Sequence, residues 1–192
     1  MSANKVKFGL DEVHYATFTI DQYGEYSYDT PVAIPGAVNI SLSAEGDSTD
    51  FYADNMIYFN STANQGYSGD LEIAMIPDSF RKDVLGEIED SNGALIEDAS
   101  VLAKGFALGF KVKGDKKNRK FWYFNCSASR PGQDAATTEA SITPQTDKIT
   151  IKAMPRLSDN KVRAVLELTD SNATAFNGFF SAVYTPAIEV SE

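Results

Sequence analysis

Alternation of apolar and polar residues is the dominant pattern along this chain, and it predicts β-strands. Residues 38–45 alternate strictly, and their polar positions are Asn39, Ser41, Ser43 and Glu45. Residues 68–75 repeat the pattern, with polar positions at Ser68, Asp70 and Glu72 and apolar positions at Leu71, Ile73 and Met75. The stretches 148–153 and 161–168 follow it as well. Each such strand is expected to pack one face on a core and to leave the other in water.

Further strands are predicted at residues 14–20, 26–34, 51–59, 105–112 and 120–125. The last of these reads KFWYFN and is apolar almost throughout. Continuous apolar runs are typical of strands covered on both faces, so this strand is expected in the middle of the fold. The predicted fold class is therefore mainly β.

Residues 77–85 are predicted to form a short helix. Either Pro77 at the first helical position or Asp78 as a side-chain cap begins it, since proline needs no donor there and aspartate accepts an orphan amide. Its apolar side is made by Phe80, Val84 and Leu85, and Gly86 ends it. A helix this short is marginal alone, so we expect it to cover a sheet edge or the opening of a β-sandwich.

A second helix is predicted over roughly 171–183, where apolar residues recur at helical spacing at Ala173, Phe176, Phe180 and Val183. Between the two helices, Asn92-Gly93 is interpreted as a two-residue hairpin turn in which both residues take positive φ. The alternative, a calcium loop in GEIEDSNGALIED, lacks oxygen ligands at the positions that matter most.

The 192 residues are interpreted as one domain, 1–192. The net charge of −10 argues against ordinary nucleic-acid binding, which neutralises phosphates with Lys and Arg. The basic stretch 111–120 contains no interleaved aromatics within its charges and is interpreted as a hairpin loop. No export signal and no run long enough to span a bilayer is found, so we expect a protein without a membrane segment.

Residues that carry chemistry are few. His14, the only histidine, lies in a strand pattern and is expected to be half-buried, and Cys126 is expected to be a free, buried thiol in a reducing cytoplasm. One histidine and one distant cysteine give no spacing for a metal site or a nucleophile with its base. We therefore expect no enzymatic activity, no metal and no cofactor.

Four motifs, in order along residues 14–156, carry a resemblance to a known family: PGAVNISLSAEG, DFYADN, GDLEIAMIPDSFRKDVLG and TPQTDKITIKAMPR. The chain resembles the major tail proteins, or tail-tube proteins, of long-tailed, non-contractile bacteriophages of Gram-positive hosts. The resemblance implies a β-sandwich with a flanking helix that assembles into hexameric rings stacked into a tube. It also implies a location in the virion tail after assembly in the host cytoplasm.

The same resemblance implies the partners. They are further copies of the chain, the tape-measure protein enclosed by the tube, tail-tip and tail-terminator proteins, and phage DNA in transit without specific binding. An acidic conduit suits this passage, because Lys or Arg on the lumen would bind phosphates and stall the DNA.

Two sets of residues are candidates for lining the channel of the tube and for contacts between its rings. The lumen candidates are Asn39, Ser41, Ser43, Ser68, Asp70 and Glu72, with an outward solvent face as the alternative. Residues 45–65 resemble a long hairpin arm that in related tubes contacts the adjacent ring. Its aromatics are candidate ring-to-ring anchors or, alternatively, core residues, and they are Phe51, Tyr52, Tyr58 and Phe59. The sequence does not indicate a role for the C-terminal segment 170–192.

The aromatic content also suits a different function. The chain has nine tyrosines and twelve phenylalanines, which suit a monomeric carbohydrate- or protein-binding β-sandwich. Most of these aromatics lie in strand patterns rather than in loop clusters, which favours the tube subunit.

Overall fold

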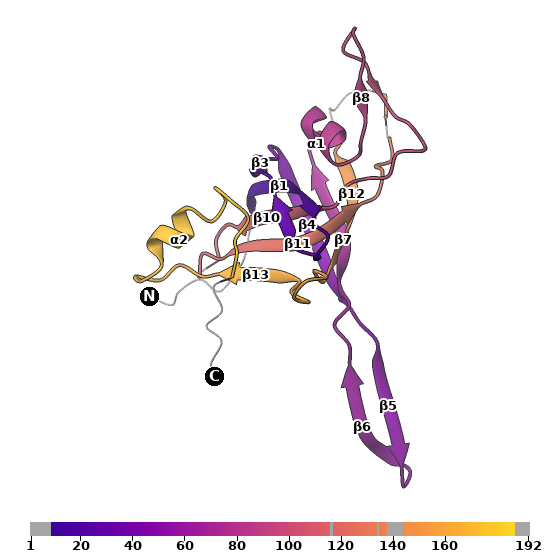
Figure 1. Ribbon diagram of the computed structural model, residues 1–192, viewed down its shortest axis with the longest axis vertical. Coiled ribbons are helices and arrows are strands. Elements are labelled where there is room, and N and C mark those ends of the chain that lie inside the picture. Colours follow the sequence, from indigo (N-terminus) through magenta and orange to yellow (C-terminus); the bar gives the residue numbers. More distant parts are fainter. Residues whose placement is uncertain (1–8, 116, 134, 138–143, 187–192) are drawn as a thin grey trace.

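The computed structural model describes residues 9–115, 117–133, 135–137 and 144–186, and it shows a mainly β protein (Figure 1). Nine strands form the main sheet, namely β1 (Leu10–Ile20), β2 (Tyr26–Tyr28), β3 (Val32–Ala33), β4 (Ala37–Glu45), β7 (Gly66–Ile73), β10 (Phe106–Val112), β11 (Lys120–Ala128), β12 (Asp147–Met154) and β13 (Arg163–Leu166). Two separate hairpins and two helices complete the fold, namely β5 (Ser48–Ala53) with β6 (Met56–Thr62), β8 (Ile88–Glu89) with β9 (Leu95–Ile96), α1 (Asp78–Asp83) and α2 (Ala173–Asn177).

The main sheet is antiparallel, in the order β2-β1-β10-β11-β12-β7-β4, while β3 also pairs with β1 and β13 with β11. It bends over its own core, because residues from both halves share one buried cluster, among them Leu71, Ile151, Tyr15 and Leu108. Cα atoms of β4 and β1, far apart in the sheet order, come within 8 Å of each other. A two-sheet sandwich was expected, whereas hydrogen bonding here runs continuously through β11 and β12.

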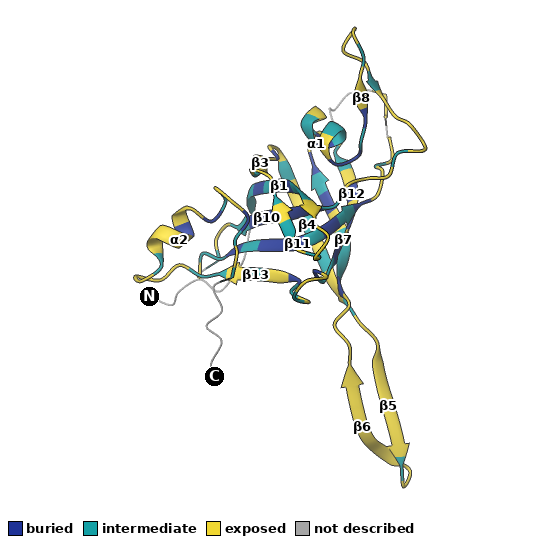
Figure 2. Ribbon diagram, in the orientation of Figure 1, coloured by how far each residue is buried: buried dark blue, intermediate teal, exposed yellow. Residues whose placement is uncertain are grey.

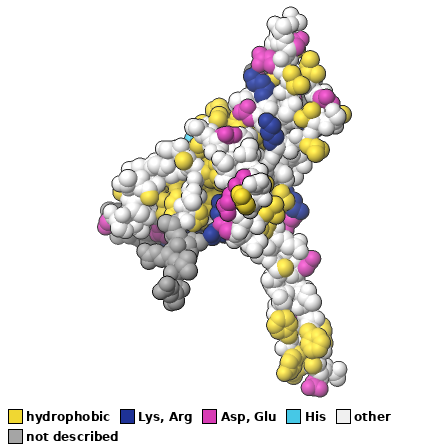
Figure 3. Space-filling model, viewed as in Figure 1, with side chains coloured by type: hydrophobic (Ala, Val, Ile, Leu, Met, Phe, Trp, Pro, Cys, Tyr) yellow, Lys and Arg dark blue, Asp and Glu magenta, His cyan; other side chains and the backbone are white. Residues whose placement is uncertain are grey.

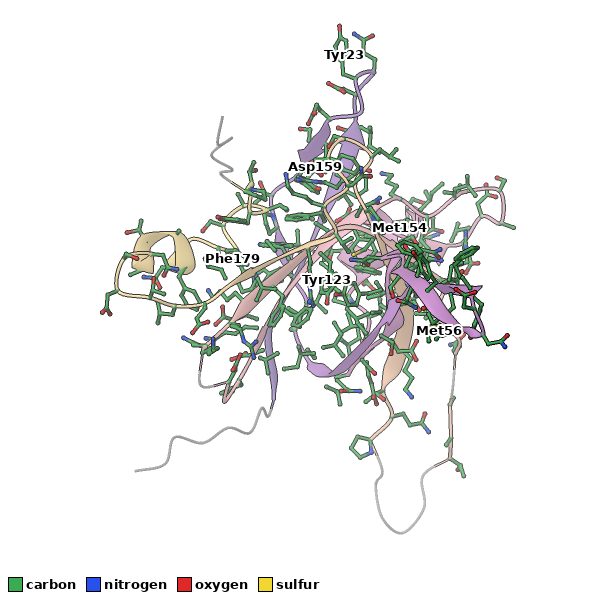
Figure 4. The ribbon with its side chains drawn as sticks, turned by 90° about the horizontal axis from the view of Figure 1, so that it is seen from below. Tyr23, Met56, Tyr123, Met154, Asp159 and Phe179 are labelled. Carbon is green, nitrogen blue, oxygen red and sulfur yellow. The ribbon has the colours of Figure 1, made fainter. Side chains whose placement is uncertain are left out.

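β11 lies in the middle of the fold, as its apolar run predicts. Trp122 and Phe124 belong to one buried cluster, while Tyr123 and Cys126 belong to another on the opposite face. Figure 4, which looks along the long axis, shows Tyr123 near the centre of the curved strands. The prediction that both faces of this strand are covered is confirmed.

α1 closes one end of the bent sheet. Phe80, Val84 and Leu85 are at most 1% exposed, so the predicted apolar side is confirmed. The ring of Phe80 meets Tyr15 edge-on, with centroids 5.1 Å apart, and the Tyr15 hydroxyl donates to Asp83 at 2.8 Å.

The predicted start of this helix needs a correction. Pro77 is itself the N-cap in extended conformation, and no side chain caps the helix, so neither proposed start is right. Helical residues run only from Asp78 to Asp83, and Val84 is the C-cap. Gly86 follows with a φ of +76°, as its role of ending the helix requires.

The C-terminal segment covers the outer face of β1, β10 and β11. Phe179 is 2% exposed and packs in one cluster with Trp122, whose indole N–H donates to the Phe179 carbonyl at 2.7 Å. Phe180 stacks on the ring of His14 at 4.8 Å. Figure 4 shows Phe179 on the side of the sheet where α2 lies. Residues 187–192 of the predicted segment 170–192 lie outside the described residues.

α2 is much shorter than the helix expected over 171–183. It ends at Asn177, because glycine is a poor helix former and Gly178 takes the C-cap position. The following carbonyl of Phe179 then accepts the indole proton instead of continuing the helix. Of the four predicted apolar positions Phe176 and Val183 are buried and Phe180 is half-buried, whereas Ala173 is exposed and the buried Phe179 was not predicted.

Two other local predictions are corrected by loop geometry. Only Gly93 of the pair Asn92-Gly93 takes positive φ, and the Asp90 carboxylate accepts the amides of Asn92 and Ala94 at 2.8 Å each. The connection is thus a longer loop organised by Asp90. Met75 is 74% exposed because β7 ends at Ile73, before the alternation does.

The middle of the basic stretch 111–120 lies in the connection from β10 to β11, as expected for a hairpin loop, whereas Lys111 belongs to β10 and Lys120 to β11. Lys111 and Lys120, at its two ends, lie 3.0 and 3.2 Å from the carboxylate of Glu12. Burial alone would raise the pKa of Glu12, but the hydrogen bonds from these two lysines outweigh it and lower the pKa. These two charges are therefore engaged within the fold.

Replacing Phe179 with Ala should lower the free energy of unfolding by roughly 3–5 kcal/mol, because a buried aromatic ring is removed. Trp122 is the only tryptophan, so its emission should also shift to longer wavelength as water reaches the indole. Denaturant melts followed by tryptophan fluorescence measure both effects. Leu157→Ala is the matched control, since Leu157 is 76% exposed, and an equal loss in both variants would contradict the covering role.

Candidate assembly surfaces

The outer surface of β4, β7 and β12 is polar along the length of the strands. Register places Ser41 opposite Asp70 and Asp70 opposite Thr150, with parallel rows on either side. This polar face consists of Asn39, Ser41, Ser43, Ser68, Asp70, Glu72, Lys148, Thr150 and Lys152. The structure thus brings all six lumen candidates together on one face.

Three members of the polar face were missed from the sequence, namely Lys148, Thr150 and Lys152 of β12. Their alternation with apolar residues is visible in the sequence. The pairing of β12 with β7 is not, because the two strands are some eighty residues apart in the chain. The three residues change the net charge of this face, because the two lysines offset the negative charges of Asp70 and Glu72. The polar face is mixed in charge, so the expected acidic lining does not describe it.

Hydroxyl groups and a lysine hold the carboxylates at this face. Thr150 Oγ1 donates to Asp70 at 2.8 Å, and Thr146 Oγ1 donates to Glu72 at 2.5 Å. Lys152 Nζ lies 3.2 Å from Glu45. These contacts fix the positions of the three carboxylates relative to their neighbours.

The arm, residues 45–65, continues the β4–β7 hairpin away from the body (Figure 1). Backbone bonds from Gln65 to Glu45 (2.8 Å) and from Ala63 to Asp47 (3.0 Å) join the sheet to β5 and β6. At the tip, Asp54 and Asn55 both take positive φ, +52° and +60°, which is typical of a two-residue hairpin turn. One long hairpin therefore supplies two sheet strands and the projecting arm.

The far half of the arm carries large apolar side chains that nothing in the described chain covers (Figure 2). Exposed fractions of the four predicted anchors are 59% for Phe51, 64% for Tyr52, 74% for Tyr58 and 60% for Phe59. The alternative that they are core residues is wrong. Figure 3 shows hydrophobic side chains gathered near the tip.

Met56 and Ile57, missed from the sequence, join these aromatics with exposed fractions of 64% and 54%. The apolar end of the arm is thus Phe51, Tyr52, Met56, Ile57, Tyr58 and Phe59. Phe51 pairs with Phe59, and the next pair is Tyr52 with Ile57. The register shifts between these two pairs, but Phe51 and Tyr52 are consecutive residues of β5 and point to opposite faces, so both faces of the arm carry large apolar side chains.

The two residues considered for chemistry are engaged in packing. His14 Nδ1 lies 2.8 Å from the Glu12 carbonyl, and its ring is the one that stacks on Phe180. Cys126 is fully buried, and burial raises the pKa of its thiol. A thiol without access to solvent and with little thiolate is a poor nucleophile.

Within the described ranges, no group of three or more His, Cys, Asp or Glu side chains is arranged to hold a metal ion. None of the helices described there is long and apolar enough to cross a bilayer. Comparison with protein-family models and with curated protein sequences finds no match to this chain. The features that bear on function are therefore the polar face, the arm and the motifs of the sequence.

Replacing Phe51, Tyr52, Tyr58 and Phe59 with Ser should leave the melting temperature within about 2 °C of the original, because these side chains add nothing to the core. The dye ANS should fluoresce strongly with the unchanged monomer and weakly with this variant. Differential scanning calorimetry and dye titration at low protein concentration measure the two effects. A large fall in melting temperature would show that the arm packs on its own body.

Proposed function

We propose that this protein is a structural subunit that assembles with copies of itself into a tube, the tail tube of a long-tailed, non-contractile bacteriophage. The observation that carries the proposal is the arm, whose apolar end is uncovered on both faces. Monomeric proteins rarely expose such a contiguous apolar surface unless it is an interaction site.

The sheet supports the same proposal through its edges. β4 ends the sheet order, so one side of this nine-residue strand has no partner strand in the described chain. Unpaired edges attract other strands, and closure into a ring of copies removes them. The family resemblance supplies the finer details of the proposal: hexameric rings, stacking, an enclosed tape-measure protein, and tail-tip and tail-terminator proteins at the two ends.

In this proposal the polar face lines the channel. Its three serines and one threonine are polar without charge, and its lysines lie among carboxylates. Such a mixed surface offers phosphates no uninterrupted run of cations, and affinity for nucleic acid grows with the number of phosphates neutralised. DNA in transit would therefore meet weak, non-specific contacts.

A monomeric binding module is the second candidate, and the observation that favours it is the exposure of Tyr52 and Tyr58, which could stack on sugars. Sugar sites are usually concave, whereas the arm is a narrow hairpin apolar on both faces. This geometry suits burial between protein surfaces better than stacking on a ligand.

Negative-stain electron microscopy of the concentrated protein, with light scattering, is the direct test. We expect rings or hollow tubes, and tube growth on added tail-tip complexes if the protein alone stays monomeric. The arm variant with four serines should form no tubes. A protein that remains monomeric with the tail-tip complex, and whose melting temperature rises with a sugar, would favour the binding module instead.

Reversing charge at the polar face tests the channel assignment. Asp70→Lys with Glu72→Lys adds cations beside Lys148 and Lys152, so tubes should still form while DNA delivery falls, because phosphates bind the new cations. Delivery is measured as infectivity of particles carrying the variant. The control is Asp70→Asn with Glu72→Gln, and normal delivery by tubes of the lysine variant would show that this face is not the channel.

A further inference from the structure

The arm and the β8–β9 hairpin lie at opposite ends of the molecule (Figure 1). β7 begins at the root of the arm with Gly66 and ends at Ile73, and α1 and β8 follow directly. A strand of this length spans on the order of 25 Å, which separates the two ends across the body.

The β8–β9 end carries its own exposed apolar side chains. Ile88 and Ile96 are cross-strand partners and are 60% and 52% exposed. Leu102 is 86% exposed, and its carbonyl oxygen lies 3.9 Å from the position that a Cβ on Gly86, two residues before Ile88, would take. These three residues, Ile88, Ile96 and Leu102, are the β8–β9 patch.

Polar contacts hold this patch in place. Arg81 Nε lies 2.9 Å from Glu87, whose side chain is only 4% exposed. Arg130 donates to the carbonyls of Asp98 and Val101 at 3.0 Å each, which ties the loop before Leu102 to the body. The segment is therefore ordered by ion pairs and hydrogen bonds, while its large apolar side chains face outward.

We propose that the β8–β9 patch is the surface that receives the apolar end of the arm from a second copy of the chain. This inference rests on the proposed function, and it identifies the receiving surface. The patch covers one face of the arm, and the other face is left for a further neighbour.

The area of the arm supports a protein partner. Its six large side chains, each more than half exposed, together offer on the order of 800 Å² over the two faces, which is one side of a standard protein interface shared between two neighbours. The arm also carries Asp47, Asp50 and Asp54 and has no Lys or Arg. A lipid surface is a poor partner, because Asp54 at the tip would enter it first and anionic headgroups repel the arm.

Two different surfaces at opposite ends give a heterologous contact, which repeats in one direction and need not close. Contact between two arms would be self-complementary and would stop at a pair. The arm-to-patch contact therefore accounts for growth along the long axis of the molecule.

Thiol crosslinking in assembled tubes tests the contact. One preparation carries Tyr58→Cys and a mass tag, the other carries Ile96→Cys, and the two are mixed, assembled and treated with a short bismaleimide. Native Cys126 is fully buried and stays silent. Both replaced side chains are exposed, so the variants should fold, and the emission of Trp122 checks this. Leu157→Cys replaces Ile96→Cys in the matched control.

We expect the 58–96 product in roughly tenfold excess over the 58–157 product, since proximity raises the effective concentration of the thiols. Tubes that give mainly 58–58 products, or no excess of 58–96, overturn the arm-to-patch contact and leave the tube proposal standing. A protein that forms no tubes even on tail-tip complexes overturns the tube proposal itself, and the arm-to-patch contact with it.

Discussion

The antiparallel pairing of β4 with β7 is the interaction on which the other surfaces depend. Its inner side buries Leu71 and Ile73, and its outer side makes most of the polar face. One end of the pair continues into the arm, and the other leads to α1 and the β8–β9 patch. Because side chains alternate, a shift of one residue would exchange the two sides completely. At Gly69 the strands are so close that a Cβ would lie 1.8 Å from the Ser41 carbonyl oxygen, which helps to fix this register.

The remaining elements make this pair rigid. α1 closes the bent sheet on one side through Phe80, and the C-terminal segment covers the other side through Phe179. β11 lies between the two covers with both faces buried. The core of the body is thus covered on both sides. The exposed apolar side chains of the arm and of the β8–β9 patch are not part of it and are available for contacts with other molecules.

Local chemistry made much of this fold predictable. Alternation identified the strands and the polar residues of β4 and β7, and Gly86 marked the end of α1 because a left-handed residue was needed there. Long-range pairing was not predictable, so the lysines of β12 and the continuity of the sheet were missed. The packing of the segment after α2 was not predictable either, because the Phe179 carbonyl accepts its hydrogen bond from a distant group, the indole of Trp122. Exposure of the arm aromatics could not be decided from pattern, because the same residues would suit a core.

The composition of the arm has a consequence for the free subunit. Residues 56–62, MIYFNST, carry no charge and favour β-structure, which is typical of segments that stack into fibrils. Asp47, Asp50 and Asp54 lie on the opposite strand and at the turn, where mutual repulsion opposes such stacking. The surface needed for ordered assembly is thus also a hazard for disordered aggregation. In subunits awaiting assembly these three carboxylates oppose stacking of the arms, and the general repulsion between subunits is weakest near the isoelectric point of about 4.6, where the net charge is zero.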